Sequence, residues 1–204
     1  MSFVKNTLFA LSFIFMIGYP FIIYYGLTTF NAKYVAVMML VFIVLRQIIL
    51  MQQIKISFHQ WVIFVVMSLI FSVVYFINDH FLLFLIPPII NLILFIAFAL
   101  TLFKSPSMIE VFALMQVDTL SPEEIQYCKN STIAWCYFFI LNGGIALFLS
   151  LSNNLVLWTF YTGFLAYILL SLLFVVELSY RYWRFRRYEG ALTDRFFKPI
   201  FPPK

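Results

Sequence analysis

The residues able to do acid–base, nucleophilic or metal chemistry are few in this chain of 204 residues. It has two histidines, His59 and His80, and two cysteines, Cys128 and Cys136. In the topology predicted below, the histidines fall on opposite sides of a membrane, so they cannot share a metal ion or a proton relay. Glu177, near the end of an apolar segment, is the other ionisable group whose position could matter.

Common catalytic and ligand-binding patterns are missing from the sequence. It has no His-x-x-x-His cluster, no Gly-x-Ser-x-Gly and no phosphate-binding glycine loop. Cys128 and Cys136 are eight residues apart, about 12 Å along a helix, which is too far for a disulfide. We therefore expect no catalytic, cofactor-binding or metal-binding residues and no cofactor. The inventory favours a protein that is not an enzyme and leaves that question open.

The composition is that of a protein embedded in lipid. Hydrophobic residues make up 64% of the chain and charged residues only 10%, with a mean hydropathy of +1.01. Soluble domains carry about 25% charged residues, and so few charges could not solvate a globule of this size. The composition excludes a soluble domain, a disordered chain and a coiled coil, and it predicts an integral membrane protein.

Six apolar stretches approach or exceed the length of about 20 residues that a helix needs to cross a bilayer. Short polar turns at residues 31–33, 78–80 and 152–154 lie between the first and second, the third and fourth, and the fifth and sixth of these stretches. We predict an all-α, polytopic membrane helix bundle, with one transmembrane domain over residues 1–190 and a tail over 191–204. The predicted spans are residues 6–26, 34–51, 61–77, 81–103, 133–151 and 155–178.

The basic residues orient this bundle. Of 13 lysines and arginines, all except Lys33 fall on the side that the two termini share. Short loops rich in these residues stay in the cytoplasm, so both termini are predicted to be cytoplasmic. The first apolar stretch continues past Gly18 to Pro20 without a small-residue cleavage site, and we expect it to stay in the mature chain. The two cysteines then lie near the reducing side, as free thiols.

The longest connection, the cytoplasmic loop of residues 104–132, carries two helix-start signals. Ser105-Pro106 places a cap residue before a proline. A short amphipathic helix lying in the membrane interface is predicted to follow, because four apolar residues then share one face. These residues are Met108, Val111, Phe112 and Met115.

The second signal, Ser121-Pro122-Glu123-Glu124, is a capping box with acidic residues in the first turn. It predicts a helix from Pro122 to Leu151. At 30 residues, or about 45 Å, this helix is longer than the hydrocarbon core by several turns.

Polar and small residues within the spans predict helix breaks and close packing. Pro87-Pro88 breaks the fourth span and frees backbone carbonyls that Asn91 or another helix could satisfy. Asn142-Gly143-Gly144 in the fifth span and the Thr159–Gly163 pair in the sixth predict close contact between these neighbouring helices. The alternative is ligand binding, with Asn91, Asn142 and Glu177 lining a polar groove.

Four arginines alternate with aromatic residues after the last span: Arg181, Arg184, Arg186 and Arg187. They can act as a positive-inside anchor, or they can contact a partner or anionic lipid, where each cation contributes about 1 kcal/mol. Because they adjoin a membrane helix, nucleic acid is not expected as a partner. Glu177 stands four residues before Arg181, which allows an intrahelical ion pair. Past Gly190 the chain lacks periodicity, and we expect a loosely docked tail.

Part of the sequence carries a recognisable pattern. It consists of Met108-Ile109-Glu110-x-Phe112-Ala113, then Tyr127-x-Lys129-x-x-Thr132-x-x-Trp135-Cys136-x-Phe138-Phe139-x-x-Asn142-Gly143, then Tyr161-x-Gly163-x-x-x-Tyr167 and a basic end. This pattern resembles a family of small uncharacterised bacterial inner-membrane proteins encoded in aryl polyene biosynthesis clusters, beside fatty-acid-synthase-like enzymes. The sequence departs from that family at Val111, where an arginine is expected, and at the additional Gly144.

The resemblance implies a pathway in which acyl chains are built on a carrier protein in the cytoplasm, joined to a lipid and exported. Our first hypothesis is a non-enzymatic inner-membrane accessory or scaffold component. Its partners would be membrane lipids and cytoplasmic acyl-chain biosynthetic enzymes or other membrane subunits. The second hypothesis is a small lipid or acyl-product transporter or flippase. The third is a membrane acyl or glycosyl transferase that uses Glu177 or His59.

Overall fold

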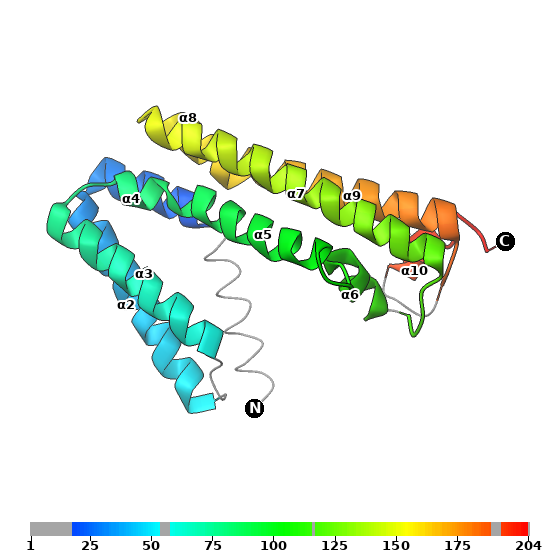
Figure 1. The fold of residues 1–204 in the computed structure, drawn as a ribbon. Coiled ribbons are helices and arrows are strands. Elements are labelled where there is room, and N and C mark those ends of the chain that lie inside the picture. Colours follow the sequence, from blue (N-terminus) through cyan, green and yellow to red (C-terminus); the bar gives the residue numbers. More distant parts are fainter. Residues whose placement is uncertain (1–17, 54–57, 116, 189–192, 204) are drawn as a thin grey trace. The chain divides into compact units, whose positions relative to one another are not determined.

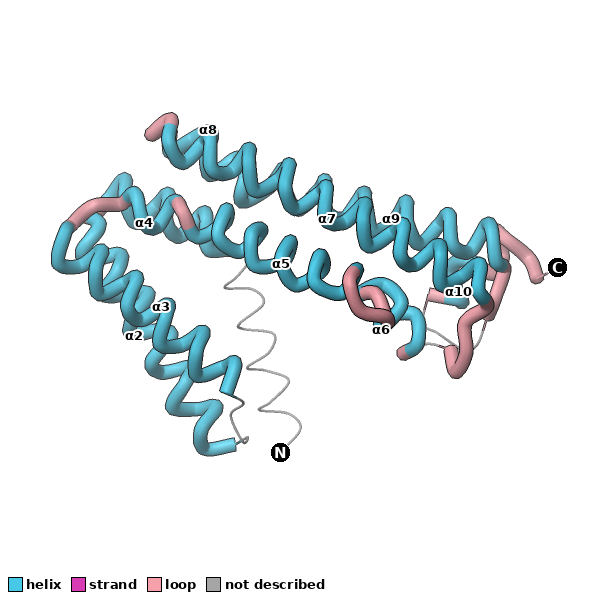
Figure 2. Tube along the Cα trace, viewed as in Figure 1, coloured by secondary structure: helices cyan, strands magenta, loops and turns pink. Residues whose placement is uncertain are grey.

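The protein is all-helical in a computed structural model that describes residues 18–53, 58–115, 117–188 and 193–203. No strand occurs within these ranges, which confirms the all-α part of the predicted fold class (Figures 1 and 2). A first helix is described over residues 18–29. It is followed by α2 (Ala32–Gln53), α3 (Phe58–Ile77), α4 (Phe81–Phe84), α5 (Ile86–Leu102), α6 (Met108–Leu114), α7 (Pro122–Leu151), α8 (Leu155–Phe160), the π-helix η1 (Tyr161–Leu165), α9 (Ala166–Phe185) and α10 (Asp194–Phe197).

Four helical segments among the described residues are long and apolar enough to cross a membrane. They are Ala32–Met51, Phe81–Leu102, Pro122–Leu151 and Leu155–Phe185. Each overlaps one predicted span, and a shorter apolar helix, Phe64–Ile77, overlaps a fifth. Most of the first predicted span, residues 6–26, lies outside the described residues. The helices are therefore compatible with a membrane protein, whereas six crossings and the side on which the termini lie stay predictions.

The chain divides into two compact units. Unit 1 comprises Met1–Ile86 and Ala146–Phe164, and unit 2 comprises Pro87–Ile145 and Leu165–Lys204. The boundaries fall at helical residues and not in linkers, because α5 begins at one of them and α7 runs through another. Each unit has its own apolar core, and each is described by itself.

The core of unit 1 forms around the fully buried indole of Trp158, on α8. This ring stacks on Phe84 of α4 with centroids 4.7 Å apart, and Tyr19 of the first helix meets it edge-on at 6.4 Å. Aliphatic side chains of the first helix, α2 and α3 complete the cluster, among them Ile23, Val35, Met39 and Val74.

The predicted break at Pro87-Pro88 is present, at Leu85, where α4 gives way to α5. In a continuous helix the carbonyls of Leu83 and Phe84 would accept hydrogen bonds from the N–H groups of residues 87 and 88. Proline has no N–H, so these two carbonyls lose their helical donors.

Side chains from three other helices supply donors instead. The Tyr19 hydroxyl donates to the Leu83 carbonyl at 2.6 Å. The Ser150 hydroxyl and the Trp158 indole N–H both donate to the Phe84 carbonyl, at 2.7 and 3.2 Å. A buried carbonyl without a donor costs about 1–3 kcal/mol, so these bonds fix the first helix, α7 and α8 against the break.

The sixth predicted span is not a continuous α-helix, because α8 passes through the π-helical turn η1 before α9. Gly163 lies in this turn, and a Cβ there would stand 3.0 Å from the Phe21 ring and 3.3 Å from Pro20. The small residue at position 163 thus serves close packing, as predicted. Its partner is the first helix, whereas the sequence predicted the fifth span in this role.

The core of unit 2 is built from aromatic rings on α5 and α7. Phe98 meets Phe139 edge-on at 5.0 Å and lies 6.2 Å from Trp135. Ile109 and Ala113 of α6 pack on the same cluster, together with Cys128 and Cys136. Both cysteines are buried and free, as predicted.

We predict that Tyr19→Phe lowers the stability of the protein in detergent by about 1–3 kcal/mol, because the Leu83 carbonyl then loses its side-chain donor. Ser150→Ala should cost less, because the Phe84 carbonyl keeps the Trp158 N–H. The control is Tyr25→Phe, at a ring that is 68% exposed. Thermal unfolding measures all three variants, and a Tyr19→Phe loss no larger than that of Tyr25→Phe would contradict the role of this bond.

Candidate functional site

The polar residues predicted within the spans lie in two separate places of unit 2. At the first, the Asn142 side-chain amide of α7 donates to Oδ1 of Asn91 on α5 at 2.9 Å. The Asn91 amide donates in turn to the Pro87 carbonyl at 3.0 Å. The Pro87 carbonyl is not one of the two that the prolines free, so of the two predicted donors for those carbonyls it is other helices, and not Asn91, that supply the bonds. The two amides form a polar bridge between α5 and α7.

Gly143 makes this bridge possible. A Cβ at Gly143 would stand 2.9 Å from the Cβ of Asn91, whereas a Cβ at Gly144 would meet nothing within 4 Å. Real Cβ atoms do not approach another carbon so closely. The first of the paired glycines therefore serves a close helix contact, but its partner is α5, whereas the sequence predicted the sixth span in this role.

Glu177 belongs to the second place. The Tyr127 hydroxyl donates to the Glu177 backbone carbonyl at 3.0 Å and lies 3.3 Å from its carboxylate. Tyr127 and Asn142 are 15 residues apart on α7, about 22 Å along the helix. The sequence had suggested that Asn91, Asn142 and Glu177 could line one polar groove. They do not lie together, because the two amides bond to each other and Glu177 packs about two-thirds of a span away.

The contact between the start of α7 and the end of α9 is aromatic and electrostatic. Tyr127 stacks on Tyr180 with centroids 5.6 Å apart and meets Phe185 edge-on at 5.5 Å. Arg181, four residues after Glu177 on α9, attracts its carboxylate electrostatically, and an ion pair between the two stays a prediction. The contact between Tyr127 and Glu177 was not predicted from the sequence, because the two residues are 50 apart along the chain.

Helix α6 starts at Met108 with Ser107 as its N-cap residue, so the predicted start at Ser105-Pro106 is wrong. Glu110 fixes the later start, because its carboxylate accepts the Ser107 N–H at 3.0 Å. The buried residues of α6 are Ile109, Glu110 and Ala113. The predicted apolar face of Met108, Val111, Phe112 and Met115 is the less buried one, and its place in a membrane interface stays a prediction.

Threonines of the flanking helices accept the first N–H groups of α6. The Met108 N–H donates to Thr101 of α5 at 2.9 Å, and the Ile109 N–H donates to Thr132 of α7 at 3.2 Å. The exposed donors of a helix start need such partners. The short helix is thereby fixed to both α5 and α7.

The start of α7 agrees with the sequence. Ser121 and Glu124 form the predicted capping box, with the Ser121 N–H donating to the Glu124 carboxylate at 2.7 Å and the Glu124 N–H donating to the Ser121 hydroxyl at 3.3 Å. The helix runs from Pro122 to Leu151, the predicted bounds.

The four arginines do not form one exposed patch. Arg187 donates to the Thr119 carbonyl at 2.6 Å and forms an ion pair with Glu124 at 3.3 Å. Arg186 ends α9 in the left-handed conformation and donates to the carbonyl of Pro202 at 3.3 Å. Arg184 is exposed, and Arg181 lines a cavity. At least two of the four therefore hold the loop and the tail against the helix ends.

The tail past Gly190 is docked more firmly than predicted. Within its described part, the Tyr182 hydroxyl donates to the Asp194 carboxylate at 2.6 Å. Phe197 stacks on the Tyr182 ring at 4.6 Å, and the Tyr188 hydroxyl donates to the Phe201 carbonyl. Aromatic stacking and hydrogen bonding order this segment, and neither leaves a periodic pattern in the sequence.

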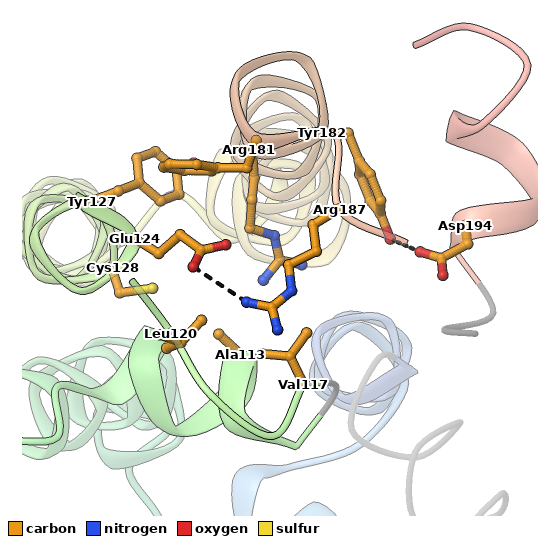
Figure 3. A pocket seen from close by; sticks show the side chains of 11 residues that line it. Ala113, Val117, Leu120, Glu124, Tyr127, Cys128, Arg181, Tyr182, Arg187 and Asp194 are labelled. Atoms are coloured by element: carbon orange, nitrogen blue, oxygen red, sulfur yellow. Dashed lines mark hydrogen bonds and ion pairs between the residues drawn. The ribbon is translucent and has the colours of Figure 1, made fainter. Parts of the chain in front are cut away.

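We call the assembly of α6, the start of α7, the end of α9 and α10 the unit-2 cap. It encloses a cavity of about 50 Å³, into which the guanidinium groups of Arg181 and Arg187 extend (Figure 3). A water needs roughly 10–15 Å³ of such space, so the cavity holds a few waters or one small polar group. The other polar residues that line it are Glu124, Tyr127, Cys128, Tyr182 and Asp194.

The chemistry of the cap is that of binding and positioning. Its charges are matched, with Glu124 against Arg187 and with Asp194 held by Tyr182. No histidine lines the cavity, and among the described residues no group of three histidine, cysteine or acidic side chains could hold a metal ion. His80 lies in unit 1, and the side chain of His59 lies outside the described residues.

No protein-family model, curated protein or solved structure matches this chain. The pattern that suggested a family can still be followed in the structure. Glu110 caps α6, Thr132 accepts its second N–H, and Gly143 admits Asn91. These residues have structural roles.

Gly143→Ala is expected to destabilise the protein by about 1–3 kcal/mol, because the added methyl group meets the Asn91 Cβ. Gly144→Ala is the matched control, since alanine gains helix propensity over glycine by about 1 kcal/mol and the site has room. Thermal unfolding of both variants should therefore give shifts of opposite sign. Equal shifts would contradict the close approach at Gly143.

Arg187→Ala should loosen the cap, because it removes the contacts with Thr119 and Glu124. We expect hydrogen exchange to rise in residues 117–126 and at the end of α9. Arg184→Ala removes an exposed arginine three residues away and serves as the control, with exchange near that of the unsubstituted protein. Unchanged protection of residues 117–126 in Arg187→Ala would show that the ion pair does not order the loop.

Proposed function

We propose that this protein is a non-enzymatic accessory or scaffold component of the bacterial inner membrane, with the unit-2 cap on the cytoplasmic side. The observation that carries the proposal is the folded cap itself, in which loop and tail are tied to the ends of α7 and α9 by Arg186, Arg187 and Tyr182. A loop that served only as a connection would not need these bonds. An ordered surface is what a docking partner requires, because little ordering entropy is then lost on binding.

The outer surface of the cap supports a partner with acidic character. Arg184, Arg195 and Lys198 are exposed on it. Large apolar side chains stand among them, with Trp183 exposed by 54%, Phe196 by 73% and Ile200 by 65%. Aromatic anchors surrounded by cations suit an acidic protein surface at the membrane. The resemblance adds the identity of that partner, a cytoplasmic acyl-chain biosynthetic enzyme of an aryl polyene or lipid pathway.

The alternatives find less support in the described residues. A transporter groove would need the polar residues of the spans to face one space, but Asn91 and Asn142 bond to each other. For a transferase, the Glu177 carboxylate packs beside the Tyr127 hydroxyl at the contact of α7 with α9 and does not line the cavity of the cap, and the side chain of His59 lies outside the described residues. We therefore propose neither activity.

Charge reversal of the exposed cap residues tests the proposal. The triple variant Arg184→Glu, Arg195→Glu and Lys198→Glu should reduce co-purification of cytoplasmic acyl-chain biosynthetic enzymes by at least about tenfold, since like charges facing each other across an interface cost several kcal/mol. Lys33→Glu in unit 1 is the control. Full co-purification with the triple variant, at normal membrane levels, would overturn the proposal.

A further inference from the structure

The three short polar turns of the chain come together in unit 1. Asn31 lies between the first helix and α2, Asn78 and His80 lie between α3 and α4, and Asn153 lies between α7 and α8. These four residues line a cavity of about 290 Å³. That volume is close to the lower end of the range of about 300–1,000 Å³ for ligand pockets. The remaining lining residues are Leu27, Phe30, Ala32, Phe84 and Leu155.

The lining combines hydrogen-bond donors and acceptors with apolar walls, and its one titratable side chain is His80, whose Nδ1 lies 3.8 Å from the Asp79 carboxylate. None of the nine lining residues is an acid, a lysine or an arginine. Each asparagine amide offers two N–H donors and one carbonyl acceptor. Phe30, which is 61% exposed, adds aromatic surface, whereas the Phe84 ring is buried against Trp158 and His80. Hydroxyl groups both donate and accept, and the C–H faces of a sugar ring pack on aromatic rings, so this lining suits an uncharged, hydroxyl-rich group.

The walls of the cavity are held in place. Asn78 accepts the Lys33 N–H at 3.1 Å, which joins two of the turns. Phe84 is stacked on Trp158, and its carbonyl is bound by Ser150. A site whose walls are already ordered loses little entropy when it binds a ligand.

Turn geometry accounts for two of the three asparagines but not for the third. Asn78 and Asn153 have positive φ angles of 54° and 52°, which asparagine tolerates better than most residues. Asn31 does not belong to the positive-φ residues. Its side chain makes no hydrogen bond to another described residue, and the same is true of Asn153. Both residues are exposed at the cavity, and their amides have no partner in the described chain.

We propose that this cavity binds an uncharged, hydroxyl-rich group, a sugar or polyol, carried either on a lipid headgroup or by a free solute. The site belongs to unit 1 and is independent of the function proposed for the unit-2 cap. Its test uses the purified full-length chain without any partner protein, so the two proposals can fail separately.

The binding test needs a detergent without a sugar headgroup, because alkyl glycosides carry the proposed ligand. The full chain in lauryldimethylamine oxide is titrated with maltose. In parallel, the chain is placed in nanodiscs of phosphatidylcholine, with or without glucosyl diacylglycerol. The thermal midpoint is measured in both arms, and we expect the hydroxyl-rich ligand to raise it, because a ligand bound by the folded state stabilises that state.

The test variant carries two substitutions together, Asn31→Ala and Asn153→Gly. Glycine keeps the left-handed backbone at position 153 while removing the amide. Losing two hydrogen bonds should weaken binding at least about tenfold. The control is Asn154→Ser in the same turn, because Asn154 does not line the cavity and serine keeps its cap bond to the Leu157 N–H. His80→Phe is a second test variant, used if the double variant at positions 31 and 153 fails to fold.

A midpoint shift that disappears in the variants but persists in Asn154→Ser supports the site. If both ligands raise the midpoint, the cavity recognises the sugar itself, whether a lipid or a solute carries it. A shift with glucosyl diacylglycerol alone identifies the ligand as a lipid headgroup. A shift with maltose alone identifies it as a free solute. The proposal is overturned if neither ligand shifts the midpoint of the unsubstituted protein. It is equally overturned if the shift survives in the variants.

Discussion

The break at Pro87-Pro88 is the constraint on which unit 1 depends. Two prolines in succession remove the helical donors of the Leu83 and Phe84 carbonyls, and an apolar surrounding offers no water to replace them. Tyr19, Ser150 and Trp158 fill this need from three other helices. Because the Leu83 and Phe84 carbonyl oxygens need hydrogen-bond donors, the side chains that supply them are held in place in the aromatic core of unit 1. It also holds the Phe84 wall of the cavity between the turns.

The same rule organises unit 2, where side chains also complete the bonding of the backbone. Thr101 and Thr132 accept the first N–H groups of α6, and Asn91 bonds to the Pro87 carbonyl. The loop and the tail follow this pattern at the helix ends, through Arg186 and Arg187. What could be taken for a basic patch in the sequence is thus partly a set of internal ties. The exposed cations that support docking come from α10 and from Arg184.

Local patterns in the sequence predicted the local structure well. The capping box at Ser121 fixed the start of α7, and the prolines at 87 and 88 marked the helix break. Pairing across helices could not be predicted, because Tyr127 and Glu177 meet only when α7 packs on α9. The start of α6 was misplaced because Ser107 with Glu110 makes a better cap than Ser105-Pro106. The cavity of unit 1 could not be predicted either, because it forms only where three turns that are distant in the sequence meet.

A double-mutant cycle between Tyr19 and the two prolines tests the central claim most directly. Alanines at positions 87 and 88 restore the N–H donors, so the Leu83 and Phe84 carbonyls no longer depend on side chains. The stability loss from Tyr19→Phe, measured by thermal unfolding, should then fall in the Pro87→Ala, Pro88→Ala background by at least about 1 kcal/mol. An equal loss in both backgrounds would contradict the claim that Tyr19 replaces a donor that proline removed.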